Sequence, residues 1–117
     1  MKTLLTACLV MLGLLTVKAG ETSGTRHGTA SWYGAECSTT ASGERYDPGS
    51  MTAAHPTLPF GTLVHVTNLG SGCSVTVRIN NRGPFTKHRV IDVSKAAAEQ
   101  LKMIRSGTAK VEYYVVK

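Results

Sequence analysis

The sequence predicts a small, mainly β protein whose strands close into a barrel. Short segments in which apolar and polar residues alternate recur along the chain, which is the period of half-buried strands. Turn-forming Gly, Pro, Ser and Asn residues separate these segments. A single stretch near the C-terminus has the composition of a helix. Five or six short strands with one helix, in fewer than about a hundred residues, are typical of a small closed β-barrel.

The N-terminus has the composition of a signal peptide, which we assign to residues 1–19. Lys2 supplies a positive charge, an apolar run follows, and small residues precede a cleavage position after Ala19. We therefore expect export to the periplasm, the cell envelope or the medium. The apolar run is too short to span a membrane. Cys8 lies at the start of this run rather than at its end, so lipidation of its thiol is not expected. Residues 20–26 are small and polar and predict a flexible leader.

The charge and the cysteines of the mature chain restrict its partners. Loss of Lys2 and Lys18 lowers the formal net charge from +6 to +4, which suits an anionic cell wall. Basic residues form no block, so nucleic acid is not an expected partner. Cys37 and Cys73 remain, and an exported chain with two cysteines most simply forms one disulfide. The alternative is a metal-binding or catalytic thiol, but ligand spacing for zinc is lacking.

The expected domain covers residues 27–117, and its strands follow in order from the alternation. The long segment 35–50 is rich in Ser, Thr, Gly, Asp and Pro and is predicted to be a loop. Strands, or short segments that are apolar on one side, are predicted at 27–34, 51–55, 62–68, 74–80, a stretch ending at 92, and 109–116. Ser94 is a good N-cap for a helix over 95–104, which Gly107 closes.

The stretch from Ser74 to Ser94 is the central feature of the sequence. Val75, Val77 and Ile79 form the apolar face of a strand, and a polar turn follows before the next strand. Polar groups held between two strands are often built into sites, because the scaffold fixes them. On the pattern alone, a functional site and a solvated β-turn are equally good interpretations.

The polar residues predict carboxylate chemistry on a neutral polar substrate, most naturally a glycan. A strand-turn-helix nucleophile elbow is absent from the sequence. Cleavage of a glycosidic bond needs a carboxylic acid that protonates the leaving oxygen. Glu44, Asp47 and Asp92 lie near the polar clusters, with Asp47 better explained as a turn residue. Asp92 alternates with buried-type neighbours, so capping the helix or anchoring the turn is an alternative role. His55 is, from its type alone, more often structural than catalytic.

Six motifs in register resemble the rare lipoprotein A (RlpA) family, from Gly28 to about Met103. These motifs are G-T-A-S-W-Y-G, T-A-S-G-E-x-Y-D, M-T-A-A-H-x-T-L-P-F-G-T, V-T-N-L, S-V-x-V-R-I-N-x-R-G-P-F and R-V-I-D-V-S-x-A-A-A. The resemblance implies a six-stranded double-psi β-barrel with one or two short helices and a polar groove. It also implies a monomeric lytic transglycosylase, without a cofactor or metal, that acts on peptidoglycan glycan strands stripped of stem peptides during cell wall remodelling and septation.

The resemblance also implies the site residues. The functional glutamate and histidine of the family fall on Glu44 and His55. The family aspartate falls on Asn81, and an amide cannot cycle between acid and carboxylate. Glu44 could then act as the acid if burial raised its pKa. More distant relatives, the expansins, carry an important aspartate in a stretch similar to V-I-D, which makes Asp92 a third catalytic candidate. The expected substrate-binding residues are Asn81, Arg82, Tyr33 and Thr52.

The amide at Asn81 also keeps a second class of function open. A barrel of this kind could bind glycan without cleaving it, as expansins loosen cell walls. It could also present a loop to a protein, as small secreted barrels that inhibit cysteine proteases do. Glu44 and His55 favour the enzyme, whereas Asn81 favours the binding module.

Overall fold

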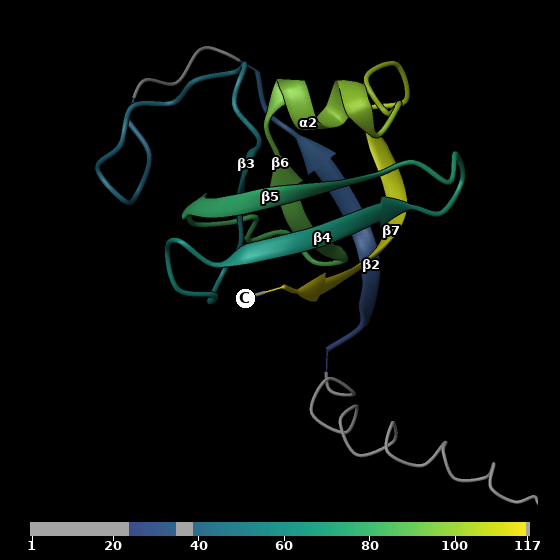
Figure 1. Cartoon of the computed structure of the whole chain (residues 1–117), viewed down its shortest axis with the longest axis horizontal. Helices are drawn as coiled ribbons and strands as arrows, with labels where there is room; N and C mark the ends of the chain where they lie inside the picture. Colours follow the sequence, from purple (N-terminus) through teal and green to yellow (C-terminus); the bar gives the residue numbers. More distant parts are fainter. Residues whose placement is uncertain (1–23, 35–38, 117) are drawn as a thin grey trace, which may run out of the picture.

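The computed structural model describes residues 24–34 and 39–116. Within them, six strands form a closed barrel in the order β2-β6-β3-β5-β4-β7. The strands are β2 (Arg26–Trp32), β3 (Thr52–Ala54), β4 (Leu63–Asn68), β5 (Ser74–Asn81), β6 (Arg89–Val93) and β7 (Thr108–Val115). One short helix, α2 (Lys95–Gln100), lies at the end of the barrel to which β6 leads (Figure 1). The predicted six-stranded, mainly β barrel is thereby confirmed.

The barrel mixes parallel and antiparallel pairing, so strands far apart in the sequence become neighbours. β2 pairs with β6 and β3 pairs with β5 in parallel, whereas the other four pairings are antiparallel. Parallel neighbours need a crossover connection: β4 lies between β3 and β5 along the chain, and β3, β4 and β5 lie between β2 and β6. In the closed barrel every described strand pairs with a neighbour on both sides. Two neighbours fix the register of each strand, and no sheet edge is left unpaired among them.

The core follows from the alternation of apolar residues along the strands. Val64 and Val66 of β4, Val77 and Ile79 of β5, and Ile91 of β6 are fully buried. Burial of each such side chain contributes roughly 1.5–3 kcal/mol relative to exposure. The polar residues between them point to the outside of the barrel, because successive side chains of a strand alternate between its two faces. The outer face is therefore where a site can be built.

The helix is shorter than predicted and ends near Leu101 instead of residue 104. Ser94 caps its N-terminus as expected, with its Oγ accepting from the Ala97 N–H at 3.2 Å. At the other end the Leu101 carbonyl accepts from Asn68 Nδ2 at 2.8 Å, and Lys102 takes a left-handed φ of 59°. A tertiary contact from β4 thus terminates the helix, and the helix-forming composition of residues 102–104 does not extend it.

Strand boundaries differ from the predictions by a few residues. β2 begins at Arg26, which the prediction assigned to the leader, and ends at Trp32. The predicted signal peptide, the flexible leader up to residue 23, and Cys8 lie outside the described residues. None of the helices in the described ranges is long and apolar enough to cross a membrane.

Candidate active site

A row of polar side chains crosses the outer face of four neighbouring strands. The pairing registers place Ser31 of β2 opposite Asp92 of β6, and Asp92 opposite Ala54 of β3. They also place Thr52 of β3 opposite Arg78 of β5. Residues directly opposite one another in a sheet lie on the same face. The strand order therefore assembles Ser31, Asp92, Thr52 and Arg78 into one surface, although they come from four separate parts of the sequence.

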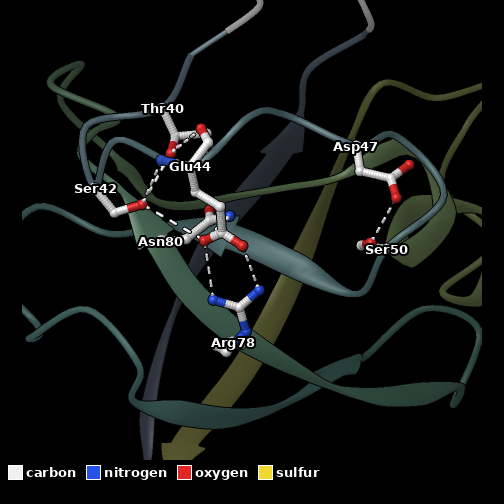
Figure 2. Close-up of polar contacts among 7 residues, drawn as sticks. All are labelled: Thr40, Ser42, Glu44, Asp47, Ser50, Arg78 and Asn80. Atoms are coloured by element: carbon white, nitrogen blue, oxygen red, sulfur yellow. Dashed lines mark hydrogen bonds and ion pairs between the residues drawn. The ribbon is translucent and has the colours of Figure 1, made fainter.

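Glu44 is held over this surface by a tight loop between β2 and β3. The Thr40 N–H donates to the Glu44 carbonyl at 2.8 Å, and the Gly43 N–H donates to the Thr40 carbonyl at 2.9 Å. Gly43 has a φ of 95°, a conformation that glycine adopts without a steric penalty. Thr40 Oγ1 adds a second hydrogen bond to the Glu44 carbonyl at 2.9 Å. Figure 2 shows the resulting direction of the Glu44 side chain, which points down to β5.

Glu44 forms a two-pronged ion pair with Arg78. Arg78 Nη1 donates to Glu44 Oε1 at 3.0 Å and Nη2 donates to Oε2 at 2.7 Å (Figure 2). Asn80 Nδ2 also donates to Oε1, at 3.3 Å. Parallel N–H···O bonds of this kind fix the orientation of the carboxylate as well as its position. The side chain of Glu44 nevertheless keeps 39% of its surface exposed, so a ligand can reach it.

These contacts correct the prediction that burial makes Glu44 the acid. The hydrogen bonds from Arg78 lower the pKa of Glu44 from 4.5 to about 2, and they outweigh the opposite effect of burial. Hydrogen bonds from Asn80 and Ser42 and the charge of Arg78 act in the same direction. Glu44 is therefore a carboxylate throughout the neutral range. It can accept hydrogen bonds or supply negative charge, but it does not hold a proton to donate.

Asp92 is the second carboxylate of the row. It accepts a short hydrogen bond from Ser31 Oγ, across the parallel pairing of β2 and β6. Its neighbours Ile91 and Val93 are fully buried, so the strand backbone beneath it is fixed by the core. The helix cap that was an alternative role for Asp92 belongs to Ser94. Asp92 is thus a half-buried carboxylate on the outer face with a hydroxyl donor at its side.

Asn81 contacts the Glu44 loop rather than the open surface. Its Oδ1 accepts from the Ala41 N–H at 2.8 Å and from the Arg82 N–H at 2.9 Å. Both contacts need only an acceptor oxygen, which an amide and a carboxylate supply equally. Asn81 therefore ties the loop that carries Glu44 to the end of β5.

Two buried polar atoms lie beside the Glu44 carboxylate and the row. Thr52 Oγ1 and Asn80 Oδ1 are inaccessible to solvent and have no hydrogen-bond partner among the described residues. Thr52 is opposite Arg78, and Asn80 already donates to Glu44. Unsatisfied buried polar groups are costly and are found where a ligand or water completes them. Both oxygens lie below the accessible surface, so a ligand on the outer face does not reach them in this conformation.

His55 contacts the turn after β3 and Tyr113 on β7. Its Nδ1 accepts from the Thr57 and Leu58 N–H groups, both at 3.1 Å, and its Nε2 lies 3.3 Å from Tyr113 Oη on β7. Burial lowers the pKa of His55 from 6.5, and the positive charges of Arg26 and Arg82 lower it further. His55 is thus a neutral, nearly buried imidazole. Its two contacts with backbone N–H groups hold the turn after β3, and its third contact joins this turn to β7.

The other two predicted binding residues, Arg82 and Tyr33, both contact neighbouring parts of the protein. Arg82 Nη1 donates to the carbonyls of His55 at 3.1 Å and Leu58 at 2.8 Å, and its guanidinium lies 4.2 Å from the centre of the Phe60 ring. Arg82 therefore braces the loop after His55. Tyr33 follows Ser31 by two residues and packs against Tyr46, with ring centres 4.7 Å apart.

Sequence reasoning missed Arg78, Asn80 and Ser31. A signal for Arg78 was present, because a charged residue stands between the buried Val77 and Ile79 in a strand that otherwise carries small polar groups. Its pairing with Glu44, 34 residues away, depends on the loop conformation and has no counterpart in local sequence.

The described residues contain neither a disulfide nor a cluster of metal ligands. Cys73 is half-buried and forms no disulfide with another described residue, and Cys37 lies outside the described residues. The predicted disulfide therefore stays a prediction. Among residues 24–34 and 39–116, no group of three or more His, Cys, Asp or Glu side chains is arranged to hold a metal ion.

Comparison with known sequences identifies similar proteins. The family described as "Lytic transglycolase" matches residues 25–113. The endolytic peptidoglycan transglycosylase RlpA of Campylobacter jejuni is 50% identical over 102 residues, which cover 86% of this chain and 36% of that protein. The protein of the same name from Neisseria meningitidis is 53% identical over 90 residues, covering 75% of this chain and 38% of the relative. The chain thus spans little more than a third of these curated relatives.

Solved structures share the fold at lower identity. A Streptomyces papain inhibitor superposes with a TM-score of 0.66 and 22% identity, covering 80% of this chain and 94% of the inhibitor. An apo expansin of Clavibacter michiganensis has a TM-score of 0.66 and 20% identity, covering 80% of this chain and 50% of the expansin. At these identities the likeness concerns the barrel fold alone.

Proposed function

The chain belongs to the lytic transglycolase family, and from this membership we propose that it is an endolytic peptidoglycan lytic transglycosylase. Its substrate is the glycan strand of peptidoglycan stripped of stem peptides. It cleaves the bond between MurNAc and GlcNAc and leaves a 1,6-anhydro end, in cell wall remodelling and septation. The observation that carries the proposal is that Glu44 and Asp92, from two motifs far apart in sequence, come to one outer face of the barrel.

We assign the proton transfer to Asp92. The guanidinium of Arg78 holds Glu44 in the ionised form, whereas the partner of Asp92 among the described residues is the Ser31 hydroxyl. The carboxylic acid gives its proton to the glycosidic oxygen, and the bond from that oxygen to C1 of MurNAc breaks with its electron pair on the leaving oxygen. The C6 hydroxyl of the same MurNAc then bonds to C1. The Asp92 carboxylate takes the proton of that hydroxyl, which regenerates the acid without consuming water.

Glu44 and Arg78 have a different role in this scheme. Their two hydrogen bonds hold a permanent carboxylate in one orientation. Positive charge develops at C1 in an oxocarbenium-like transition state, and a fixed carboxylate stabilises such charge without reorganising. His55, Asn81 and Arg82 act indirectly, by fixing the loops around the surface.

The test uses amidase-stripped sacculi as substrate. The wild-type chain is expected to release 1,6-anhydro products, identified by mass spectrometry. Asp92→Asn is expected to lower the rate by about 10²–10⁴-fold, because general acid–base catalysis contributes that much. Asp47→Asn is the matched control, since Asp47 is an exposed turn residue whose carboxylate accepts from the Gly49 N–H and Ser50 Oγ (Figure 2).

Glycan-binding and papain-inhibition measurements beside this assay separate the alternative functions. Retained binding to stripped glycan without anhydro products would overturn the enzyme proposal and favour a non-catalytic glycan-binding module. Loss of papain activity on adding the chain would favour a cysteine-protease inhibitor. Full activity of Asp92→Asn with loss in Glu44→Gln would move the acid to Glu44.

The proposed action on peptidoglycan also includes export of the chain and a disulfide between Cys37 and Cys73. Peptidoglycan lies outside the cytoplasmic membrane, so action on it requires export. N-terminal sequencing of the isolated protein is expected to begin at Gly20, and thiol titration to find Cys37 and Cys73 oxidised. An uncleaved N-terminus together with two free thiols would contradict both expectations.

A further inference from the structure

A basic hollow lies on the outer face of the barrel where β2, β7 and the turn before β6 meet. Its volume is about 490 Å³, and it is lined by His27, Gly28, Thr29, His88, Val90 and Lys110. None of these residues belongs to the polar row around Glu44 and Asp92. The hollow therefore has no part in the proposed glycan cleavage.

Three basic side chains from three segments converge on this hollow. His27 comes from β2, His88 from the turn before β6, and Lys110 from β7. Thr29 on the floor is opposite Lys110 on one side and Arg89 on the other, so a second permanently charged side chain flanks the same position. Positive charges gathered from several elements concentrate an attractive field for anions in a concave surface.

An acidic residue, Glu112, forms an ion-pair contact with His27 at the edge of the hollow. Glu112 is opposite His27 in register, and its Oε1 lies 3.3 Å from His27 Nε2. This contact orients the His27 ring on β2. Lys110, His88 and Arg89 make no ion pair within the described residues. The positive charge of the hollow is thus only partly compensated by its surroundings.

Two backbone features shape the hollow, a close contact at Gly28 and a left-handed conformation at His88. A Cβ at Gly28 would lie 2.4 Å from Val90 Cγ1, so glycine is needed for the close contact that forms the floor. His88 has a φ of 74°, which non-glycine residues adopt rarely. Its carbonyl accepts from the Thr29 N–H at 3.4 Å, which joins the turn to β2. Side chains held in such conformations are over-represented at functional sites.

We propose that this hollow binds a phosphate group, as a monoester or diester. A tetrahedral anion with several acceptor oxygens can take hydrogen bonds from the Lys110 ammonium and the two imidazoles at once. A planar carboxylate offers only two oxygens to three donors. In an envelope protein the phosphate belongs to a soluble phosphate ester or to a lipid headgroup, and both present the same chemistry to the hollow.

The first test is a titration of the isotopically labelled full chain with inorganic phosphate and with glycerol phosphate, followed by NMR at pH 6 and low salt. Saturable shifts are expected for the ring signals of His27 and His88 and for the Thr29 amide. Lys110→Gln is expected to weaken binding at least tenfold, and 0.5 M salt to weaken it as well, because exposed charges are screened. Lys95→Gln, at an exposed lysine that begins α2, is the matched control.

The second test distinguishes the sources of the phosphate. Co-sedimentation of the full chain with phosphatidylglycerol vesicles but not with phosphatidylcholine vesicles, lost in Lys110→Gln, would identify a lipid headgroup. Saturable binding of glycerol phosphate without vesicle capture would identify a soluble ester. The proposal is overturned if none of these probes binds, or if Lys110→Gln and Lys95→Gln respond alike. Glycan cleavage by Lys110→Gln is expected at the wild-type rate, so the two proposals fail independently.

Discussion

At the scale of single residues, the candidate site depends on how environment separates two carboxylates. Glu44 is fixed in its ionised form by Arg78, whereas Asp92 has a serine hydroxyl as its partner. Two acidic side chains with the same chemistry in solution can thereby take different roles. The identity of the residues predicted an acidic site, and the Arg78 guanidinium decides that the Glu44 carboxylate stays ionised.

The pairing of Glu44 with Arg78 predicts a measurable titration. The carboxyl signal of Glu44 is expected to titrate at about pH 2 in the wild-type chain and close to 4.5 in Arg78→Gln. Because the pKa is lower in the folded chain, the contribution of this pair to stability is complete above pH 4.5. It is lost as the pH falls toward 2. Arg105→Gln, on an exposed loop, should leave the signal unchanged, and equal titration of Arg78→Gln and the wild type would contradict the assignment.

Asn81 gives a second prediction at this scale. An aspartate oxygen can accept from the Ala41 and Arg82 N–H groups as the amide oxygen does, so Asn81→Asp is expected to keep activity within a few-fold. Asn81→Ala removes the acceptor and should lower activity while increasing hydrogen exchange at the Ala41 amide. A tenfold or larger gain in Asn81→Asp would show instead that the missing carboxylate is the acid.

At the scale of elements, capping determines where the helix begins and ends. Ser94 is fully buried, and its Oγ donates to the Ser50 carbonyl at 2.6 Å besides capping α2. One side chain therefore joins the helix to the segment before β3. That segment leads from the Glu44 loop to Thr52, so the helix start and the site share a support.

Loss of this cap is expected to destabilise the protein. Ser94→Ala removes an N-cap acceptor and leaves the Ser50 carbonyl without its donor, which together cost about 1–3 kcal/mol. The free energy of unfolding from urea denaturation measures the change. Ser74→Ala, an exposed serine at the start of β5, is the control and should change the free energy by less than about 0.5 kcal/mol. Equal effects of the two variants would rule out the capping role.

At the scale of the whole molecule, closure of the barrel places a histidine where it must stay neutral. His55 joins the turn after β3 to Tyr113 on β7, two strands that are not neighbours in the barrel. Its Nδ1 accepts two backbone N–H groups, which protonation would disrupt. The family histidine thus supports the closed shape of the barrel in this structure.

This arrangement predicts a loss of stability in mild acid. The pKa of His55 is lower in the folded chain than its ordinary 6.5, so the unfolded chain binds more protons just below that value. The free energy of unfolding is therefore expected to fall as the pH drops from 7.5 to 5.5. In His55→Asn, whose side-chain oxygen can accept the same N–H groups, this dependence should be smaller. His65→Asn on the exterior serves as the control, and identical pH slopes in both variants would contradict the prediction.

The sequence by itself determined the composition of the barrel and most of its strand positions. Alternation of apolar residues depends on the local period of a strand, so it can be read without knowing which strands pair. The motifs likewise made Glu44, Asp92 and Thr52 candidate site residues, because residue type limits the chemistry. Local sequence also identified Ser94 as a cap, since capping involves residues only three positions apart.

Only the tertiary structure decided which of these residues act together. The two parallel pairings bring Ser31, Asp92, Thr52 and Arg78 onto one face, and register between distant strands is not encoded in any single strand. The pKa of Glu44 depends on a guanidinium 34 residues away, and the end of α2 depends on the Asn68 side chain of β4. Electrostatic and capping interactions act over a few ångströms in space whatever the separation along the chain, so they appear only when the barrel is closed.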